Sequence, residues 1–202
     1  MTGFRKLNDD DNIKKVALWI YSSNAELFDK IFLNKSHAVS AIGKLITSEY
    51  INPYHRKFIT VLYQDNPNLI CAIAVSFKGS EITLPDTFDA FRVAGNVNIK
   101  RVLLYELVSI MFSSHIKYND YYLANLYVDK KYRKKNLVVK LIEKIKQKAR
   151  QTNSNNLFID IECDNLSLID FYSKLDFERY NLNYHTIIRR RLGYTSMIYK
   201  IK

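Results

Sequence analysis

The stretch VDKKYRKKNLVVKLIEKIKQKAR occupies residues 128–150 and contains most of the excess positive charge of the chain. It begins with the apolar end of a predicted strand, continues through a loop with five basic residues, and enters an amphipathic helix. A strand, a basic loop and a helix N-terminus together form an arrangement that binds phosphate groups. The turn RKKNLV contains no glycine, although turns that hold phosphate usually need one. Two interpretations are open: a cofactor site built without glycine, or a solvated basic loop.

Length and composition predict a single folded domain. The chain has 202 residues, of which 48% are hydrophobic and 13% aromatic, which is enough for a sizeable core. The chain has only five Gly and three Pro, which is too few to indicate a flexible linker between domains. We expect one domain over residues 1–202, with front helices over about residues 11–50 and a core over about residues 57–202.

The net charge of +11 is unevenly distributed along the chain. Residues 129–150 contain ten basic and two acidic side chains, and Arg189, Arg190 and Arg191 form a smaller cluster. A protein adapted to nucleic acid would spread its basic residues more evenly, so nucleic acid is not the expected partner. The concentration favours a local site for an anionic ligand.

The cysteines and histidines argue against a disulfide framework and a metal site. Cys71 and Cys163 lie far apart without a CxxC motif, so two reduced, buried thiols are expected. The four histidines are scattered without the spacing of metal ligands. No apolar run approaches the ~18 residues that a membrane span needs, and no signal-like segment follows the first residues. We therefore expect a soluble, cytoplasmic protein with no metal and no membrane partner.

The periodicity of apolar residues predicts helices first, then a hairpin, then alternating strands and helices. Helical spacing extends over residues 11–33 with a break near residue 24, and over residues 36–51, 86–95, 96–116, 137–150 and 167–175. Strand patterns cover residues 4–8, 58–64, 68–77, 121–128, 156–163, 177–183 and 195–201. Ser36 is the expected N-cap of the helix over residues 36–51. In the helix over residues 137–150, Val138 is among the residues whose side chains are expected to face the core. This order indicates an α/β or α+β fold with a mixed sheet.

Two motifs in this order resemble those of the GNAT N-acetyltransferase superfamily. In that family a central strand ends in V-x-P-x-[YF]-R-G-x-G-x-[GA], which opens a helix, and residues 128–142 here read VDKKYRKKNLVVKLI. After the next strand the family has D-N-x-x-A-x-x-[FL]-Y-x-K-L-G-F, and residues 164–177 here read DNLSLIDFYSKLDF. The resemblance covers nearly the whole chain. It implies an α/β (α+β) fold with a mixed, mostly antiparallel central sheet flanked by helices.

The resemblance also implies a chemistry, the transfer of an acetyl group from acetyl-CoA to an amine without a metal. Backbone N–H groups of the loop and the following helix would bind the pyrophosphate, and the end of the strand would separate from its neighbour and pair with the pantetheine arm. Asn165 would contact the pantetheine or cap the helix that follows it. The cofactor-binding residues implied are Leu126, Tyr127, Val128, Arg133, Lys134, Lys135, Asn136, Leu137, Val138 and Asn165.

Three positions depart from the glycines of the family pattern, namely Asn136, Val138 and Asp176. Asn and Asp are the residues other than glycine that best tolerate a positive φ, at roughly 1 kcal/mol each, so Asn136 and Asp176 are expected to keep their turns. The branched side chain of Val138 is expected to hold the pyrophosphate away from the helix. Direct contacts from the basic loop would compensate, at roughly 1.5–3 kcal/mol for a partly desolvated cation–phosphate bond. The basic residues concerned are Lys130, Lys131, Arg133, Lys134 and Lys135.

The catalytic candidates come from the same resemblance. Tyr172 aligns with the tyrosine that protonates the departing thiolate in many members, and its alternative role is a buried tyrosine bonded to a carbonyl. Tyr122 stands where some members carry a strand glutamate, so the general base is not identified directly. Glu162 would act as the base through a water, and Asp160 shares its strand face; a solvated or lysine-paired face is the alternative. His185 lies between the last two predicted strands, with no visible partner.

Three functions remain open on the sequence. The first is an acetyl-CoA-dependent N-acetyltransferase whose acceptor is an unidentified small molecule, peptide or protein amine. The second is a catalytically silent protein of this fold that binds coenzyme A or a partner, favoured by the missing glycines. The third is a basic nucleic-acid-binding module, which would lose affinity steeply with salt. A homodimer formed through the final strands is also an expectation.

Overall fold

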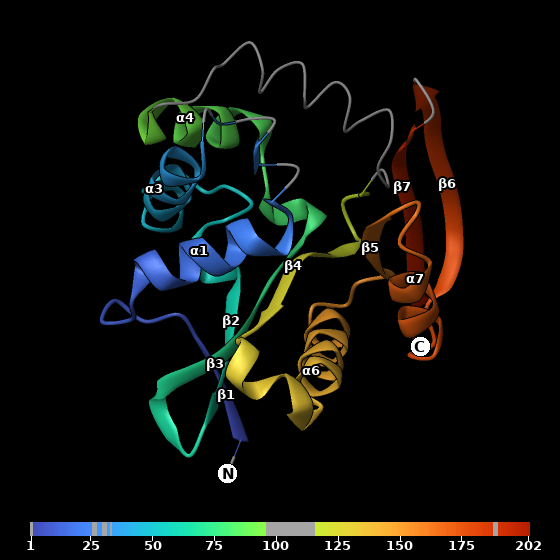
Figure 1. The fold of residues 1–202 in the computed structure, drawn as a ribbon, viewed down its shortest axis with the longest axis horizontal. Coiled ribbons are helices and arrows are strands. Elements are labelled where there is room, and N and C mark those ends of the chain that lie inside the picture. Colours follow the sequence, from blue (N-terminus) through green and yellow to red (C-terminus); the bar gives the residue numbers. More distant parts are fainter. Residues whose placement is uncertain (1, 26–27, 30–31, 33, 96–115, 188–189) are drawn as a thin grey trace.

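The computed structural model describes the chain except residues 1, 26–27, 30–31, 33, 96–115 and 188–189. Its centre is a seven-stranded sheet in the order β1-β2-β3-β4-β5-β7-β6 (Figure 1). The strands are β1 (Thr2–Lys6), β2 (Ile59–Gln64), β3 (Asn66–Lys78), β4 (Tyr121–Val128), β5 (Asn156–Glu162), β6 (Glu178–Ile187) and β7 (Arg190–Lys200). All neighbouring pairs are antiparallel except β4 and β5, which are parallel. The predicted mixed, mostly antiparallel sheet is confirmed.

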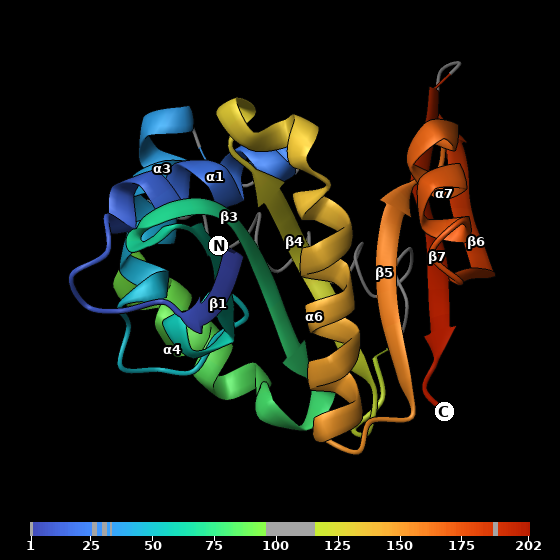
Figure 2. The same cartoon turned by 90° about the horizontal axis from the view of Figure 1, so that it is seen from below.

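Helices cover both faces of this sheet (Figure 2). They are α1 (Ile13–Ser23), α3 (Lys35–Ile46), α4 (Leu84–Ala94), α6 (Leu137–Gln151) and α7 (Leu166–Ser173), with short 3-10 helices η1 (Arg56–Phe58), η2 (Gly79–Glu81) and η3 (Lys130–Lys135). The group α1, α3 and α4 packs on one face, hereafter the front face, and α6 and α7 pack on the other. Among the described helices, none is long and apolar enough to cross a membrane.

The period-two alternation of the strands divides the apolar residues between two cores. On β3, Ile73 and Val75 point to the front core, while Ala72 and Ala74 point to the core under α6. The side chains of the central strands are almost fully buried at the centre of both cores. The sheet is therefore held by helices on both sides, which fixes the positions of β4 and β5 in its middle.

Most predicted elements are confirmed, with corrections at their ends, the largest of which is that β6 extends to Ile187 and β7 begins at Arg190. Asn34, not Ser36, caps α3, because its side chain accepts the N–H of His37 at 3.0 Å. Leu137 is fully buried at the start of α6, whereas Val138, expected inward, is only half-buried. The hairpin turn is tighter than expected, since β3 begins at Asn66 and Asp65 alone turns the chain, with a φ of 62°. The helix predicted over residues 96–116 lies almost wholly outside the described residues.

Candidate functional site

The two parallel strands in the middle of the sheet separate after only two paired positions. Tyr121 pairs with Leu157, and Tyr122 pairs with Phe158. Residues 123–128 of β4 have no partner in β5. Figure 2 shows β4 and β5 diverging toward their C-terminal ends. The backbone of β4 therefore offers unpaired N–H and C=O groups to an extended ligand beside it.

A β-bulge explains why the strands part at this point. The pairing of β4 with β3 shifts between Leu123 and Asn125, so the extra residue is Ala124. A bulge bends its strand and increases the local twist, and this one follows directly after the last residue paired with β5. It also moves the polar Asn125 to the front face, where its side chain donates to Ser23 of α1 at 2.7 Å. The opening is thus built into β4.

The helices α6 and α7 follow β4 and β5 along the chain, so both helix N-termini lie toward the wide end of the opening (Figure 2). Ligands of open α/β sheets bind at the carboxyl ends of parallel strands for this reason. Before α6, η3 carries the basic residues, and Asn136 then turns the chain with φ 52° and ψ 26°. Its side chain makes no capping bond, so the first N–H groups of α6 remain available as donors. The predicted left-handed conformations are confirmed for Asn136 and also for Asp176, with a φ of 63°.

The residues that end β4 divide between the two faces. Leu126 and Val128 pack against the core under α6, and Tyr127 packs on the front face. The Tyr127 ring stacks on Trp19 of α1 with 5.4 Å between centroids, and the Arg133 guanidinium lies 6.0 Å from the Tyr127 centroid. Through these two contacts of the Tyr127 ring, η3 is connected to α1. The side chains of Lys134 and Lys135 lie outside the described part of the chain, so their phosphate contacts stay a prediction.

Val138 occupies the second position of α6. Its side chain packs partly against the core under that helix, beside the fully buried Leu137. The expectation that Val138 displaces the pyrophosphate remains a prediction.

The second helix at the opening, α7, carries Asn165 and Tyr172. Asn165 caps α7 by accepting the N–H of Leu168 at 3.2 Å, which confirms its structural role and leaves its cofactor contact a prediction. The Tyr172 ring is almost fully buried and meets the rings of Phe171 and Phe177 edge-on. Burial alone raises the pKa of Tyr172 well above its usual 10, so the phenol stays protonated near neutrality. Its hydroxyl makes no hydrogen bond with a described residue, so the expected alternative, a carbonyl-bonded tyrosine, is not found there.

The two acidic candidates of β5 differ in their surroundings. Glu162 is exposed at the end of β5, opposite Tyr194 of β7. Asp160 is half-buried and accepts two hydroxyl hydrogen bonds, from Tyr122 at 3.1 Å and from Ser196 at 2.6 Å. The solvated face proposed from the sequence is therefore wrong for Asp160. Its bond to Tyr122 joins β5 to β4 at the point where the strands separate.

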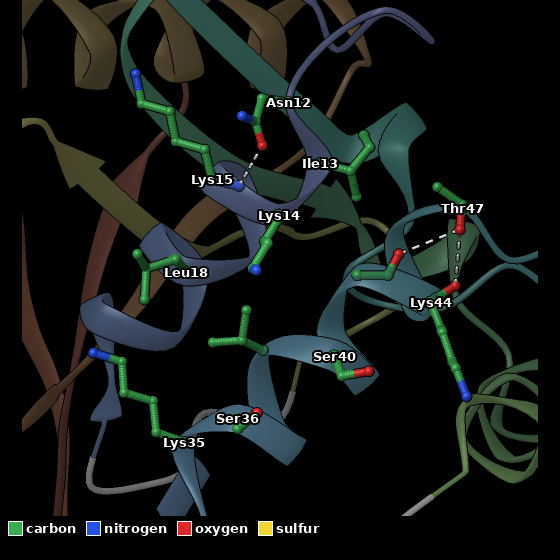
Figure 3. A pocket seen from close by; sticks show the side chains of 12 residues that line it. Asn12, Ile13, Lys14, Lys15, Leu18, Lys35, Ser36, Ser40, Lys44 and Thr47 are labelled. Atoms are coloured by element: carbon green, nitrogen blue, oxygen red, sulfur yellow. Dashed lines mark hydrogen bonds between the residues drawn. The ribbon is translucent and has the colours of Figure 1, made fainter.

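A separate basic groove of about 1030 Å³ lies between α1 and α3 (Figure 3). Lys14, Lys35 and Lys44 surround it, and no residue of β4, η3, α6 or β5 lines it. Lys15 lines its edge and lies 3.9 Å from Asp129, the residue that precedes η3. The groove is thus a neighbour of the strand opening and not a part of it.

Comparison with known families identifies this architecture. Residues 93–177 match the model of the acetyltransferase (GNAT) family, and this range includes β4, η3, α6, β5 and α7. These residues of the chain are therefore similar to the GNAT family. The opening between β4 and β5 lies within the matched residues, where the two sequence motifs also lie. No curated protein sequence matches the chain significantly.

Solved structures show the same GNAT fold over the whole chain. A crystal structure of an N-acetyltransferase from Staphylococcus aureus Mu50 is 14% identical, with a TM-score of 0.69 over 98% of this chain and 100% of that chain. Another acetyltransferase structure is 17% identical, with a TM-score of 0.67 over 99% and 100%. A GNAT family acetyltransferase from Elizabethkingia anophelis, with acetyl-CoA bound, is 9% identical, with a TM-score of 0.56 over 98% and 97%. At these identities the likeness concerns the fold alone.

Two features of the site were not predicted from the sequence. The bulge at Ala124 has a sequence signal, because Asn125 interrupts an apolar strand and asparagine is uncommon in strands. The hydrogen bonds from Tyr122 and Ser196 to Asp160 have no such sequence signal, because they depend on the register of three strands that are distant in sequence. The expected position of His185 between the last two strands is wrong, because β6 extends to Ile187 and includes His185, whose side chain is outside the described residues.

Proposed function

We propose that the protein is an acetyl-CoA-dependent N-acetyltransferase that acts on an amine. The observation that carries this proposal is the opening between β4 and β5, which leads to the N-terminus of α6 through a basic loop turned by Asn136. An unpaired strand edge suits the amide groups of a pantetheine arm, and helix N–H groups suit a pyrophosphate. The similarity of residues 93–177 to the GNAT family, and the acetyl-CoA bound in one structure of the same fold, support the same cofactor.

The residues of the opening have distinct tasks in this proposal. The unpaired backbone of β4 holds the pantetheine extended, while the first turn of α6 and the basic loop neutralise the phosphates. The amine nitrogen forms a bond to the thioester carbonyl carbon, and the carbon–sulfur bond then breaks. The departing thiolate takes a proton from the phenol of Tyr172, which burial keeps protonated. Two protons leave the ammonium nitrogen in all: one replaces the phenol proton and the other is released.

Isothermal titration of acetyl-CoA into the purified protein tests the cofactor site, with desulfo-CoA as the second ligand. We expect micromolar dissociation constants, and at least about tenfold weaker binding when Lys134 and Lys135 are both replaced by Glu, since each lost cation–phosphate bond is worth ~1.5 kcal/mol or more. Replacing Lys35 and Lys44 of α3 together by Glu is the charge-matched control and should leave the affinity unchanged. No binding at millimolar ligand would refute the proposal. Binding without turnover of any amine would favour the silent GNAT-fold protein.

The left-handed turn at Asn136 gives a sharper test of the loop. Asn136→Val is expected to weaken acetyl-CoA binding about tenfold or more, because a β-branched residue cannot hold a φ of 52° without moving the first turn of α6. Asn136→Gly should retain or improve the affinity, since glycine adopts this conformation without strain. Both dissociation constants are measured by the same titration.

The control for this prediction lies at the other end of the same helix. Asn153 also has a positive φ, of 50°, just after α6. Asn153→Val therefore introduces the same backbone strain away from the opening, and should lower the melting temperature without changing acetyl-CoA affinity. Equal losses of affinity in Asn136→Val and Asn153→Val would show that the effect is general destabilisation, and that the turn has no particular role.

A further inference from the structure

The basic groove between α1 and α3 has an apolar floor formed by Ile13, Leu18 and Val39. These side chains are half-buried and pack against the front core, so each presents part of its surface to the groove. The volume of about 1030 Å³ is at the upper end of the ~300–1,000 Å³ typical of small-molecule pockets. A groove between two packed helices also has the shape into which a third, amphipathic helix fits its apolar side chains.

The charged residues around this groove are all lysines. Lys14 and Lys15 come from α1, Lys35 and Lys44 come from α3, and no carboxylate is among the described residues that line it (Figure 3). Lys15 pairs with Asp129 at 3.9 Å. The other three lysines form no ion pair with any residue that the structure describes. An acidic occupant would therefore be attracted from both sides of the groove.

Gly43 keeps the surface of α3 open beside the floor. Within the described part of the chain, a Cβ at this position would meet only Ile13, at 4.0 Å, which is ordinary van der Waals contact. The packing of α1 on α3 therefore leaves room for a side chain here. A glycine inside a helix is destabilising relative to alanine. Close approach of a partner to α3 accounts for this cost, whereas the packing of the described helices does not.

The lining residues favour a protein segment over nucleic acid or a membrane surface. No aromatic residue is among the described lining residues, so bases would find no ring on which to stack. The apolar side chains are half-buried in the floor, whereas binding to a membrane surface needs apolar side chains that project and insert. Beyond Lys44, an adjoining hollow against α4 contains Glu49, which would repel acidic residues and so limits the site at that end.

We propose that this groove binds an amphipathic helix of a partner protein, with apolar residues on one face and Asp or Glu along both edges of that face. The apolar residues of the partner lie on the floor. Its carboxylates pair with Lys14 on one side and with Lys35 and Lys44 on the other. The site contains no residue of the strand opening, so it is independent of the proposed function.

Selection from a phage-displayed library of random peptides tests this assignment without imposing a charge or a pattern. The peptides have about 16 residues, enough for four helical turns. We expect the enriched peptides to be net acidic, with apolar residues three or four positions apart. Fluorescence anisotropy then measures their dissociation constants. Replacing Lys35 and Lys44 together by Glu should weaken binding about tenfold or more, because each change turns an attraction into a repulsion.

Two further variants separate the groove from general charge attraction. Replacing Lys174 and Lys202 together by Glu changes the net charge by the same amount at exposed positions outside the groove, and should change peptide affinity by less than about twofold. Gly43→Leu keeps every charge but fills the open space on α3, and should weaken binding about tenfold. Its melting temperature should not fall, because leucine is a better helix former than glycine.

Each outcome decides for or against the groove. Enriched acidic peptides that lose affinity in both the Lys35/Lys44 and the Gly43 variants support the proposal. It is overturned if no peptide is enriched, if the enriched peptides are not acidic, if Gly43→Leu binds them as the wild type does, or if the Lys174/Lys202 variant loses as much affinity as the Lys35/Lys44 variant.

Two other ligands test the alternatives that the lining residues disfavour. They are vesicles containing phosphatidylserine and a single-stranded oligodeoxythymidine. Binding of either one that is lost in the Lys35/Lys44 variant, with no acidic peptide enriched, would overturn the proposal and assign the groove to that ligand. The titration with acetyl-CoA is separate from all of these measurements, so failure here leaves the proposed function intact.

Discussion

Tyr172→Phe is expected to lower the turnover number about 100-fold or more, while the dissociation constant for acetyl-CoA changes by less than about twofold. A positioned general acid contributes roughly 10²- to 10⁴-fold to a reaction, and the phenol hydroxyl is the only group that this substitution removes. The Tyr172 hydroxyl carries its proton at neutral pH, because its ordinary pKa is already near 10 and burial raises it further. Pre-steady-state and steady-state rates of thiol release measure the effect once an acceptor amine is available.

The substitution is structurally mild, which makes the result interpretable. The edge-on contacts of the Tyr172 ring with Phe171 and Phe177 remain in a phenylalanine, and no hydrogen bond to a described residue is lost. The melting temperature should therefore stay within about 2 °C, as expected for a stability change under ~0.5 kcal/mol.

Tyr121→Phe provides the matched control for this experiment. Tyr121 is buried in the same core and burial also raises the pKa of its phenol, but it stands at the start of β4, before the strands separate. Its variant should retain full turnover. Full turnover in Tyr172→Phe as well would mean that the thiolate takes its proton from another group, or directly from water.

The fold was predictable because its elements carry strong local signals. The β4–η3–α6 segment combines an apolar strand, a basic loop and a helix of period 3.6, and residues 164–177 repeat a recognisable turn and helix. The positive φ angles of Asn136 and Asp176 were predictable for a chemical reason, because few other residues replace glycine there at so low a cost. The cap of α3 was missed by two residues because Asn34 and Ser36 are both good N-caps.

The candidate site was predictable only in part, because its details depend on pairing between distant strands. The separation of β4 from β5 was expected from the family resemblance, but the bulge that produces it depends on the register with β3. Asp160 was considered as one of two similar carboxylates on β5. Only the register with β7 shows that Ser196 fixes Asp160 and that Glu162 lies exposed at the strand end.

The burial of Lys146 was also missed, since apolar periodicity assigns charged residues of a helix to its exposed face. Lys146 is on α6, yet its side chain is 2% exposed. Its ammonium donates to Glu143 and to the carbonyl of Leu175, each at 2.8 Å, and lies 4.4 Å from the centroid of the Tyr199 ring. A lysine that is satisfied in these three ways can be buried, and it links α6 to the turn that follows α7.

Lys146→Ala is expected to lower the free energy of unfolding by about 2–4 kcal/mol, the range for removing a buried, hydrogen-bonded charge together with its packing. The Leu175 carbonyl loses its donor, and the aliphatic stem no longer fills the space beside Phe177 and Tyr199. Glu143 is half-exposed and can return to water, so the cost stays below that of stranding a buried carboxylate. Urea denaturation measures the change, and a fall of roughly 5–15 °C in the melting temperature should accompany it.

Lys140→Ala tests whether the location of the lysine on α6 determines this loss. Lys140 lies on the same helix but is exposed, and among the described residues its ammonium donates to the hydroxyl of Thr2. Its removal should change the free energy of unfolding by less than ~0.5 kcal/mol. Because Leu175 lies two residues beyond the end of α7, Lys146→Ala should also loosen the helix that carries Tyr172 and so reduce turnover, which Lys140→Ala should not. A loss below about 1 kcal/mol for Lys146→Ala would mean that the α6–α7 contact is held by apolar packing alone.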